Sequence, residues 1–237
     1  MIIIPGKPKD ICTQTKNTLE NSNVEEGIED LIEFLDTPEA EKNETGFTED
    51  FNGNISMTTV GEYSTTSGPA MGHYGVYHVH PNGLGSINIF SPKDIASLID
   101  YALVQTPSSH ISNGYVGLIA KEPCANCPGG IKYIHYVIRF TGTPAQMQNL
   151  QLPFSENKLR KWSTNQTMFE RTLRDAYKNV PDNGFINQEG REKVFFKTLQ
   201  DMGLESLITL QRIENNSTII NITQDADGSI NLPIICN

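Results

Sequence analysis

Apolar residues recur at helical spacing in four segments of the chain. Between residues 22 and 36, apolar side chains fall three or four positions apart, with Glu and Asp between them. This periodicity predicts an amphipathic helix that ends before Pro38. Ser22 and Glu25 have the spacing of a capping box and mark its expected start. The same periodicity predicts three further helices, over 92–103, 159–180 and 194–202, the last of them stopped by Gly203.

Strands are predicted where β-branched and aromatic residues gather between turn residues. Residues 44–60 are predicted to form a hairpin, because the turn-forming pair Asn52-Gly53 precedes a β-rich run. Residues 61–73 are predicted to be a loop. The remaining predicted strands are 74–80, 115–120, 131–140, 207–213, 218–223 and 230–235, with a turn at Asp227-Gly228 between the last two.

This order of elements predicts an α/β fold, a mixed β-sheet flanked by helices. At 237 residues the chain is long enough for one sizeable core, so we expect a single domain over 1–237. Residues 1–10 contain two prolines and a glycine, and they resemble a linker that follows another domain. The predicted helix 22–36 would then be the first regular element.

The net charge narrows the choice of partners. The chain has 28 acidic and 18 basic residues, a net charge of -10. Such a surface repels the phosphate backbone of nucleic acids and gains little from an anionic membrane, so we expect neither as a partner. No apolar stretch approaches the roughly 20 residues that span a bilayer, and residues 1–5 are too short for a signal-peptide core. The compartment and the oligomeric state stay open.

Four cysteines are too sparse to be the main source of stability in a chain of this length. Cys124 and Cys127 have the spacing of half a zinc knuckle, but no second such pair exists, and the prolines and glycines around them indicate a hairpin tip. A local disulfide or two free thiols is therefore favoured over a structural zinc site. Cys12 and Cys236 lie near opposite ends of the chain and would form a disulfide if the termini meet.

A His-Val-His-Pro sequence, residues 78–81, ends one predicted strand. Successive side chains of a strand point to opposite faces, so His78 and His80 would share one face and direct both imidazoles at one metal ion. Asp94, at the start of the following helix, would add an oxygen ligand. Two nitrogens and one oxygen leave a tetrahedral zinc ion one open position for water, as in catalytic zinc sites.

Each of these residues also has a structural explanation. The two histidines fit a polar pair on a half-exposed strand. Ser91 and Asp94 fit a helix N-terminus with Pro92 in its first position, where the hydroxyl caps the helix and the carboxylate faces the macrodipole. Both explanations are compatible with a metal site, because a carboxylate at the third helical position points back over the helix start. His135, inside the predicted strand 131–140, is expected to pack in the core.

Taken together, an upstream Glu, the His-x-His-Pro sequence and the Ser-x-x-Asp sequence resemble the motif of the JAMM (MPN-plus, JAB-like) metalloproteases, and the chain resembles a bacterial member of that family. The resemblance covers residues 44–142 and implies a JAMM/MPN-like core with a cytidine-deaminase-like layout. Residues 143–237 would be an extension of helices and a β-hairpin. The stretch 81–91 is longer than in the eukaryotic isopeptidases, a departure that concerns the loop and the substrate.

The resemblance also implies a role for each site residue. His78, His80 and Asp94 would bind Zn²⁺, and Ser91 would help to stabilise the oxyanion of a tetrahedral intermediate. A Glu on an earlier strand would take a proton from the attacking water and return it to the leaving amine. Glu44, within the sequence Glu-Thr-Gly-Phe, is the favoured base. Glu49, in the middle or turn of the same hairpin, and Glu62, close to the histidine strand, remain alternatives.

The leading hypothesis is therefore a zinc-dependent hydrolase that cleaves an amide bond in a peptide or protein, including ubiquitin-like or isopeptide-linked substrates. The zincin, serine-hydrolase and P-loop motifs are all absent from the chain. Two alternatives belong to other classes. One is an MPN-type binding or structural module without turnover, and the other is an effector-like domain of a larger bacterial protein, suggested by the linker-like start and the acidic composition.

Overall fold

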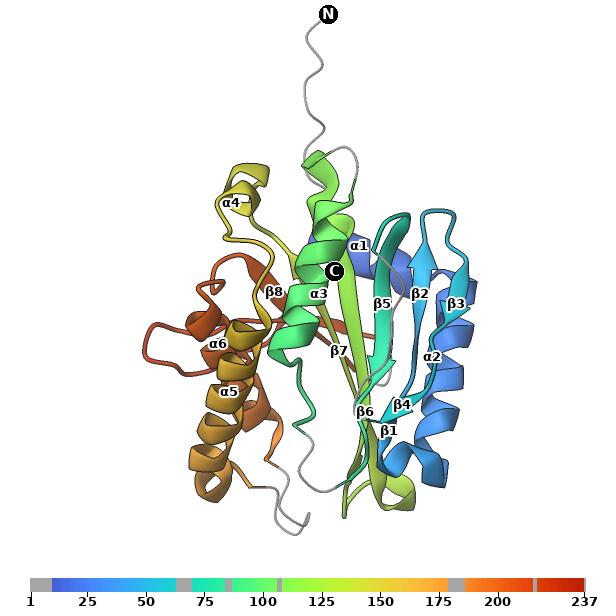
Figure 1. Ribbon diagram of the computed structural model, residues 1–237. Helices are drawn as coiled ribbons and strands as arrows, with labels where there is room; N and C mark the ends of the chain where they lie inside the picture. The colour runs from blue at the N-terminus through green and yellow to red at the C-terminus, as the bar shows by residue number, and fades with distance from the viewer. Residues whose placement is uncertain are drawn as a thin grey trace, which may run out of the picture.

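The computed structural model describes residues 10–62, 70–83, 87–105, 108–178, 186–214 and 217–236, which form an eight-stranded sheet with helices on both faces (Figure 1). The strand order is β10-β9-β8-β7-β6-β5-β2-β3. These strands are β2 (Gly46–Asp50), β3 (Ile55–Met57), β5 (His73–Val79), β6 (Tyr115–Pro123), β7 (Ile131–Phe140), β8 (Ile208–Ile213), β9 (Ile219–Ile222) and β10 (Ile234–Ile235). β1 (Asn43–Glu44) and β4 (Gly61–Glu62) form a separate two-stranded pair.

The sheet is mixed, as the sequence predicts. β5 and β6 are parallel, and the chain passes between them through α3 (Pro92–Leu103), while the other neighbouring pairs are antiparallel. The predicted hairpin is confirmed, because β2 and β3 pair around a turn in which Gly53 has a φ of 80°. A parallel strand–helix–strand unit therefore lies beside an antiparallel hairpin, and this arrangement places the site described below.

Helices on the two faces of the sheet bury two apolar cores (Figure 1). α3, α5 (Glu156–Tyr177) and α6 (Gln188–Met202) pack on the face that carries Val76 and Leu118. α1 (Ile11–Leu19) and α2 (Ser22–Leu35) pack on the opposite face, which carries Tyr77 and Ile119. Side chains along β5 and β6 alternate between the two faces of the sheet, so each face carries its own group of apolar residues. Among the residues described, no helix is both long enough and apolar enough to cross a membrane.

The residues after 143 continue the same sheet. β8 pairs with β7 along five residues, with Ile138 opposite Leu210, and β9 and β10 add to its outer edge. α6 ends at Gly203, which has a φ of 72°, so the predicted stop is confirmed. A short helix that the sequence did not predict, α4 (Pro144–Gln148), begins with a capping box formed by Thr143 and Gln146. The extension therefore completes the core of the sheet and does not form a separate layer.

Several predicted boundaries are wrong. Helix α2 is capped by Asn21, whose side chain accepts a hydrogen bond from the Asn23 amide, so the capping box expected at Ser22 does not form. The predicted strand 230–235 is reduced to β10, which pairs with β9, and a single bridge at Ile230. The expected loop 61–73 contains β4 and the first residue of β5, while residues 63–69 lie outside those described.

Helix α1 was also not predicted, and only residue 10 of the expected linker 1–10 is described. The inward face of α1 is polar: Thr15 bonds the Gln211 side chain, and Arg139 donates to the hydroxyls of Thr15 and Thr18. A helix that buries polar side chains leaves no apolar periodicity in the sequence. Its sequence, with three threonines and Ile, Cys and Asn among nine residues, also has low helix propensity.

The four cysteines form two disulfides. Cys12 in α1 bonds to Cys236 after β10, so the two ends of the described chain meet, as the sequence analysis allowed. Cys124 and Cys127 bond to each other at the tip of the β6–β7 hairpin. Both sulfurs of that pair are thereby consumed, and the tip is not a zinc knuckle.

Candidate metal centre

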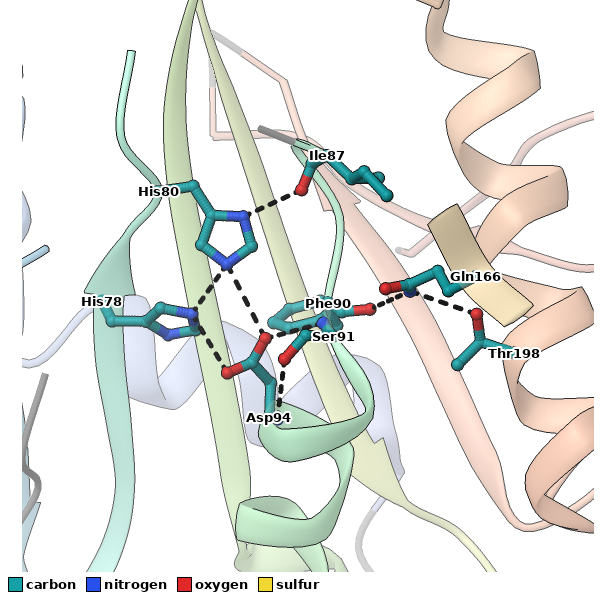
Figure 2. Close-up of polar contacts among 8 residues, drawn as sticks. All are labelled: His78, His80, Ile87, Phe90, Ser91, Asp94, Gln166 and Thr198. Carbon is teal, nitrogen blue, oxygen red and sulfur yellow. Dashed lines mark hydrogen bonds and ion pairs between the residues drawn. The ribbon is translucent and has the colours of Figure 1, made fainter. Parts of the chain in front are cut away.

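The two histidines lie at the carboxyl end of β5, on the face of the sheet covered by α3. His78 is the second-last residue of β5, and His80 follows the strand but still donates its amide to the Ile119 carbonyl, at 3.2 Å. Because the two residues are two positions apart, both imidazoles extend from the same face. Figure 2 shows them directed at Asp94, which comes from the first turn of α3.

The possible ligand atoms lie close together. The Nε2 atoms of His78 and His80 are 3.2 Å apart. Asp94 faces both of them, with Oδ1 at 3.4 Å from Nε2 of His78 and Oδ2 at 3.7 Å from Nε2 of His80. The side chains are 5, 11 and 19 % exposed, in the order His78, His80 and Asp94. The three groups thus converge in a largely buried space that is most open beside the carboxylate.

The backbone around His80 selects its tautomer. Nδ1 of His80 lies 2.9 Å from the carbonyl oxygen of Ile87. A carbonyl can only accept, so Nδ1 carries the hydrogen, and in the neutral imidazole Nε2 presents a lone pair to the centre. Histidine ligands of metals are commonly oriented in this way by a carbonyl behind the ring.

Asp94 serves the helix and the centre at once. Ser91 caps α3: its hydroxyl oxygen accepts from the Asp94 amide at 3.3 Å, and its own amide donates to Oδ2 of Asp94 at 2.7 Å. This capping box fixes the direction of the carboxylate and leaves Oδ1 facing His78. The Ser91 hydroxyl accepts in this contact, so its hydrogen remains available for a further bond. The predicted helix start is confirmed.

The electrostatics favour a charged Asp94 carboxylate and a more basic His80 imidazole. Burial alone would raise the pKa of Asp94, but the two facing imidazoles and their hydrogen bonds hold it well below its ordinary value. Burial disfavours a charged His80, yet the hydrogen bond and charge of Asp94, together with the charge of Glu44, raise the pKa of this imidazole. The centre is therefore arranged to attract a cation.

Glu44 lies just before β2, the strand that pairs with the histidine strand. Across the β2–β5 pair Gly46 stands opposite His78, and the amide of Val79 continues the pairing by donating to the Thr45 carbonyl at 2.9 Å. Glu44 itself lies in β1, two residues before Gly46, where its backbone pairs with Gly61 of β4. It is half-buried, and its charge acts on His80. Its role as the base stays a prediction.

The two alternative bases lie elsewhere or outside the described atoms. Glu49 stands opposite Gly75. It is three positions from Gly46 along β2, so its side chain points to the other face of the sheet, towards α1 and α2. There it accepts hydrogen bonds from the Tyr115 hydroxyl at 2.8 Å and from the Asn21 amide at 2.9 Å. Glu62 lies in β4, where its backbone pairs with Asn43 of β1. The side chain of Glu62 is not among the atoms described. Glu49 cannot reach the centre from its face.

The donor set fits a zinc ion. The ligand atoms of His78, His80 and Asp94 all lie within 4.8 Å of one another, and no other group of this kind occurs among the described residues. Two imidazole nitrogens and one carboxylate oxygen form a three-residue ligand set of the kind that catalytic zinc sites use, with a fourth position open to a small molecule. The geometry alone does not select zinc from other divalent ions that favour nitrogen and oxygen ligands.

Sequence reasoning missed two contributors to this centre. The carbonyl of Ile87 orients His80, but a backbone carbonyl has no residue-specific signal. Gln166 of α5 donates to the carbonyl of Phe90, directly before Ser91, at 2.8 Å. A polar residue inside an apolar helix face was the only available hint of that contact.

Comparison of the chain with protein-family models, with curated proteins and with solved structures gives no match.

Proposed function

We propose that this protein is a zinc-dependent hydrolase of the JAMM type, which cleaves a peptide or isopeptide bond. The observation that supports the proposal best is the convergence of His78, His80 and Asp94 at the end of β5 and the start of α3. The β5–α3–β6 unit with the antiparallel hairpin beside it is compatible with a JAMM/MPN-like core.

His78, His80 and Asp94 would hold the zinc ion. When bound, zinc supplies a Lewis acid and lowers the pKa of a coordinated water towards neutrality. Glu44, whose charge acts on His80, would accept the proton of the attacking water and later deliver it to the leaving nitrogen. The Ser91 hydroxyl, whose oxygen already caps α3, would donate its hydrogen to the developing oxyanion. Each side chain would thus have a distinct role in amide hydrolysis.

The substrate we propose is a peptide or a protein, with ubiquitin-like and isopeptide-linked chains included. The acidic surface of the chain, with its net charge of -10, favours a partner that is neutral or basic around the scissile bond. A leaving amine in such a substrate needs a proton donor, which is the role given to Glu44.

The test is cleavage of a degenerate peptide library and of isopeptide-linked ubiquitin-like chains, followed by mass spectrometry. Zinc-loaded wild-type protein should produce new amino termini or released modifiers, and the Asp94→Ala variant should not. Cleavage that persists in Asp94→Ala or after chelation would contradict the proposal. Zinc binding without cleavage of any amide substrate would instead favour an MPN-type binding module.

A further inference from the structure

A short segment, Ile87–Ser91, connects the two halves of the candidate centre. At one end, the carbonyl of Ile87 accepts from Nδ1 of His80 at 2.9 Å. At the other end, the amide of Ser91 donates to Oδ2 of Asp94 at 2.7 Å. The segment contains no helix or strand, although the Ile87 carbonyl also accepts from the Ile89 amide at 2.8 Å. Contacts from other elements add to this local bond.

α5 supplies one of these contacts, through Gln166. Its Nε2 atom donates to the carbonyl oxygen of Phe90 at 2.8 Å and lies 3.1 Å from the hydroxyl oxygen of Thr198 in α6 (Figure 2). The Thr198 hydroxyl in turn donates to the Val194 carbonyl at 2.8 Å. Gln166 and Thr198 are both buried. Gln166 is thus held between the two helices with its amide directed at the segment.

The carbonyl that Gln166 contacts belongs to the same peptide group as the amide that contacts Asp94. A peptide unit is planar, so its C=O and N–H point in opposite directions and turn together. A hydrogen bond to the Phe90 oxygen therefore also sets the direction of the Ser91 N–H. It polarises the peptide as well, which strengthens the bond that the N–H makes to the carboxylate.

Two residues of the segment, Phe90 and Asn88, also have contacts that involve α6. The ring of Phe90 is fully buried and packs edge-on against Phe195 of α6, with centroids 6.1 Å apart. The Asn88 side chain donates to Oε1 of Glu122 at 3.1 Å, and that oxygen is also bonded by Arg191 of α6. α6 thus contacts the segment directly at Phe90 and indirectly at Asn88, through Glu122 of β6.

We propose that Gln166 is a positioning residue of the metal centre, which orients Asp94 through the Phe90–Ser91 peptide group. This inference rests on the proposed function, since it assigns Asp94 as a ligand. It gives the C-terminal helices a role in the centre that the motif itself does not contain. Loss of the Gln166 amide leaves the Phe90 carbonyl without its buried partner, and the peptide can then turn away from Asp94.

The test compares three substitutions of buried polar residues in the helical extension. Gln166→Met keeps the length and volume of the side chain but has no donor. Glu192→Gln is the matched control, because buried Glu192 accepts from the Tyr136 hydroxyl and from Arg212, which both lie outside the segment. Thr198→Val is a milder variant that removes only the hydroxyl beside Gln166. Zinc dissociation constants are measured by competition with a chromophoric chelator.

We expect Gln166→Met to raise the zinc dissociation constant about tenfold, in the range seen when residues behind metal ligands are removed. Thr198→Val should raise the zinc dissociation constant about threefold, because one hydrogen bond makes a modest net contribution. Glu192→Gln should raise it less than about twofold, because Tyr136 and Arg212, the partners of Glu192, lie outside the segment. An unchanged constant in Gln166→Met, or an equal rise in Gln166→Met and Glu192→Gln, would overturn the inference, because the second result reports only a general loss of stability.

Amide hydrogen exchange of Ser91 in metal-free protein separates this inference from the proposed function. Exchange at Ser91 should be faster in Gln166→Met than in wild type and unchanged in Glu192→Gln. If wild-type protein binds no zinc, the proposed function fails, and Ser91 exchange then decides whether Gln166 orients the peptide. Unchanged exchange in Gln166→Met would reject that orientation whatever the metal result.

Discussion

Gly46 lies directly opposite His78 across the β2–β5 pair, and the two strands leave no room for a side chain at that glycine. A Cβ atom on Gly46 would overlap the carbonyl oxygen of Tyr77 and lie 3.0 Å from Cα of His78. The spacing of the hairpin from the histidine strand thus depends on this glycine. Glu44 lies two residues before this glycine.

Gly46→Ala should therefore damage both the fold and the centre. Because the added methyl group meets backbone atoms, β2 must move away from β5, at a cost of about 2–4 kcal/mol in the free energy of unfolding. Zinc affinity should fall as well. Urea unfolding measures the first effect, with Ser56→Ala on exposed β3 as the control, expected within about 0.5 kcal/mol of wild type. A Gly46→Ala protein as stable as the control would contradict the close approach.

Glu44→Gln should keep the metal and lose turnover. The amide cannot accept the proton of the attacking water, so we expect kcat to fall by about 10²–10⁴-fold on any cleaved substrate. Glu49→Gln is the matched control, since Glu49 lies on the same hairpin but faces α1 and α2. That variant should retain turnover. Full activity in Glu44→Gln, or equal losses in the two variants, would exclude Glu44 as the base.

The two disulfides should differ in their effect on stability. Cys12 and Cys236 are 224 positions apart, whereas Cys124 and Cys127 are three apart. In the chain-entropy description, opening the long loop costs about 5 kcal/mol and opening the short one about 2 kcal/mol. The double serine variant of each pair, unfolded in urea, tests the difference. Equal losses of unfolding free energy in the two variants would show that loop closure in the unfolded chain does not determine how much a disulfide stabilises this protein.

Stability should fall when the solution is acidified, because His135 is partly buried. Burial lowers the pKa of His135 to about 4, and its Nε2 atom lies 3.1 Å from the Tyr77 hydroxyl. The unfolded chain, with an ordinary histidine pKa of about 6.5, binds this proton at a higher pH than the folded protein does. The contribution is therefore fully present above about pH 6.5 and is lost as the pH falls towards 4, by about 2–3 kcal/mol.

Urea unfolding of the His135→Gln variant between pH 4 and 7 measures this term. The dependence of the free energy of unfolding on pH should be shallower than in wild type. His110→Gln, which removes an exposed histidine, should leave the slope unchanged. The assignment is excluded if His135→Gln and wild type lose stability in parallel.

The candidate ligands could be predicted from the sequence because each depends on local geometry. The two-residue period of a strand places His78 and His80 on one face, and the capping box of Ser91 and Asp94 fixes the helix start. The exclusion of Glu49 needed the structure, since it depends on the register of β2 against β5. A shift of one residue would move Glu49 to the other face of the sheet.

Features that depend on contacts between distant residues were not predictable. Asn21 caps α2 in preference to Ser22, and its side chain also bonds Glu49 and the Gly53 carbonyl, partners that the local sequence does not reveal. The interaction of Gln166 with the Phe90 carbonyl joins residues 76 positions apart. Helix periodicity identifies α5, but the contacts of a buried amide within it are set by the packing of three separate segments.

The zinc content of protein purified without added metal tests the central claim most directly. Wild-type protein should contain about one zinc ion per chain, or take up one when zinc is supplied, and His78→Ala should do neither, because only two of the three ligands remain. The His110→Gln variant should match wild type. Metal-free wild-type protein that also fails to bind added zinc, while remaining folded, would contradict the account.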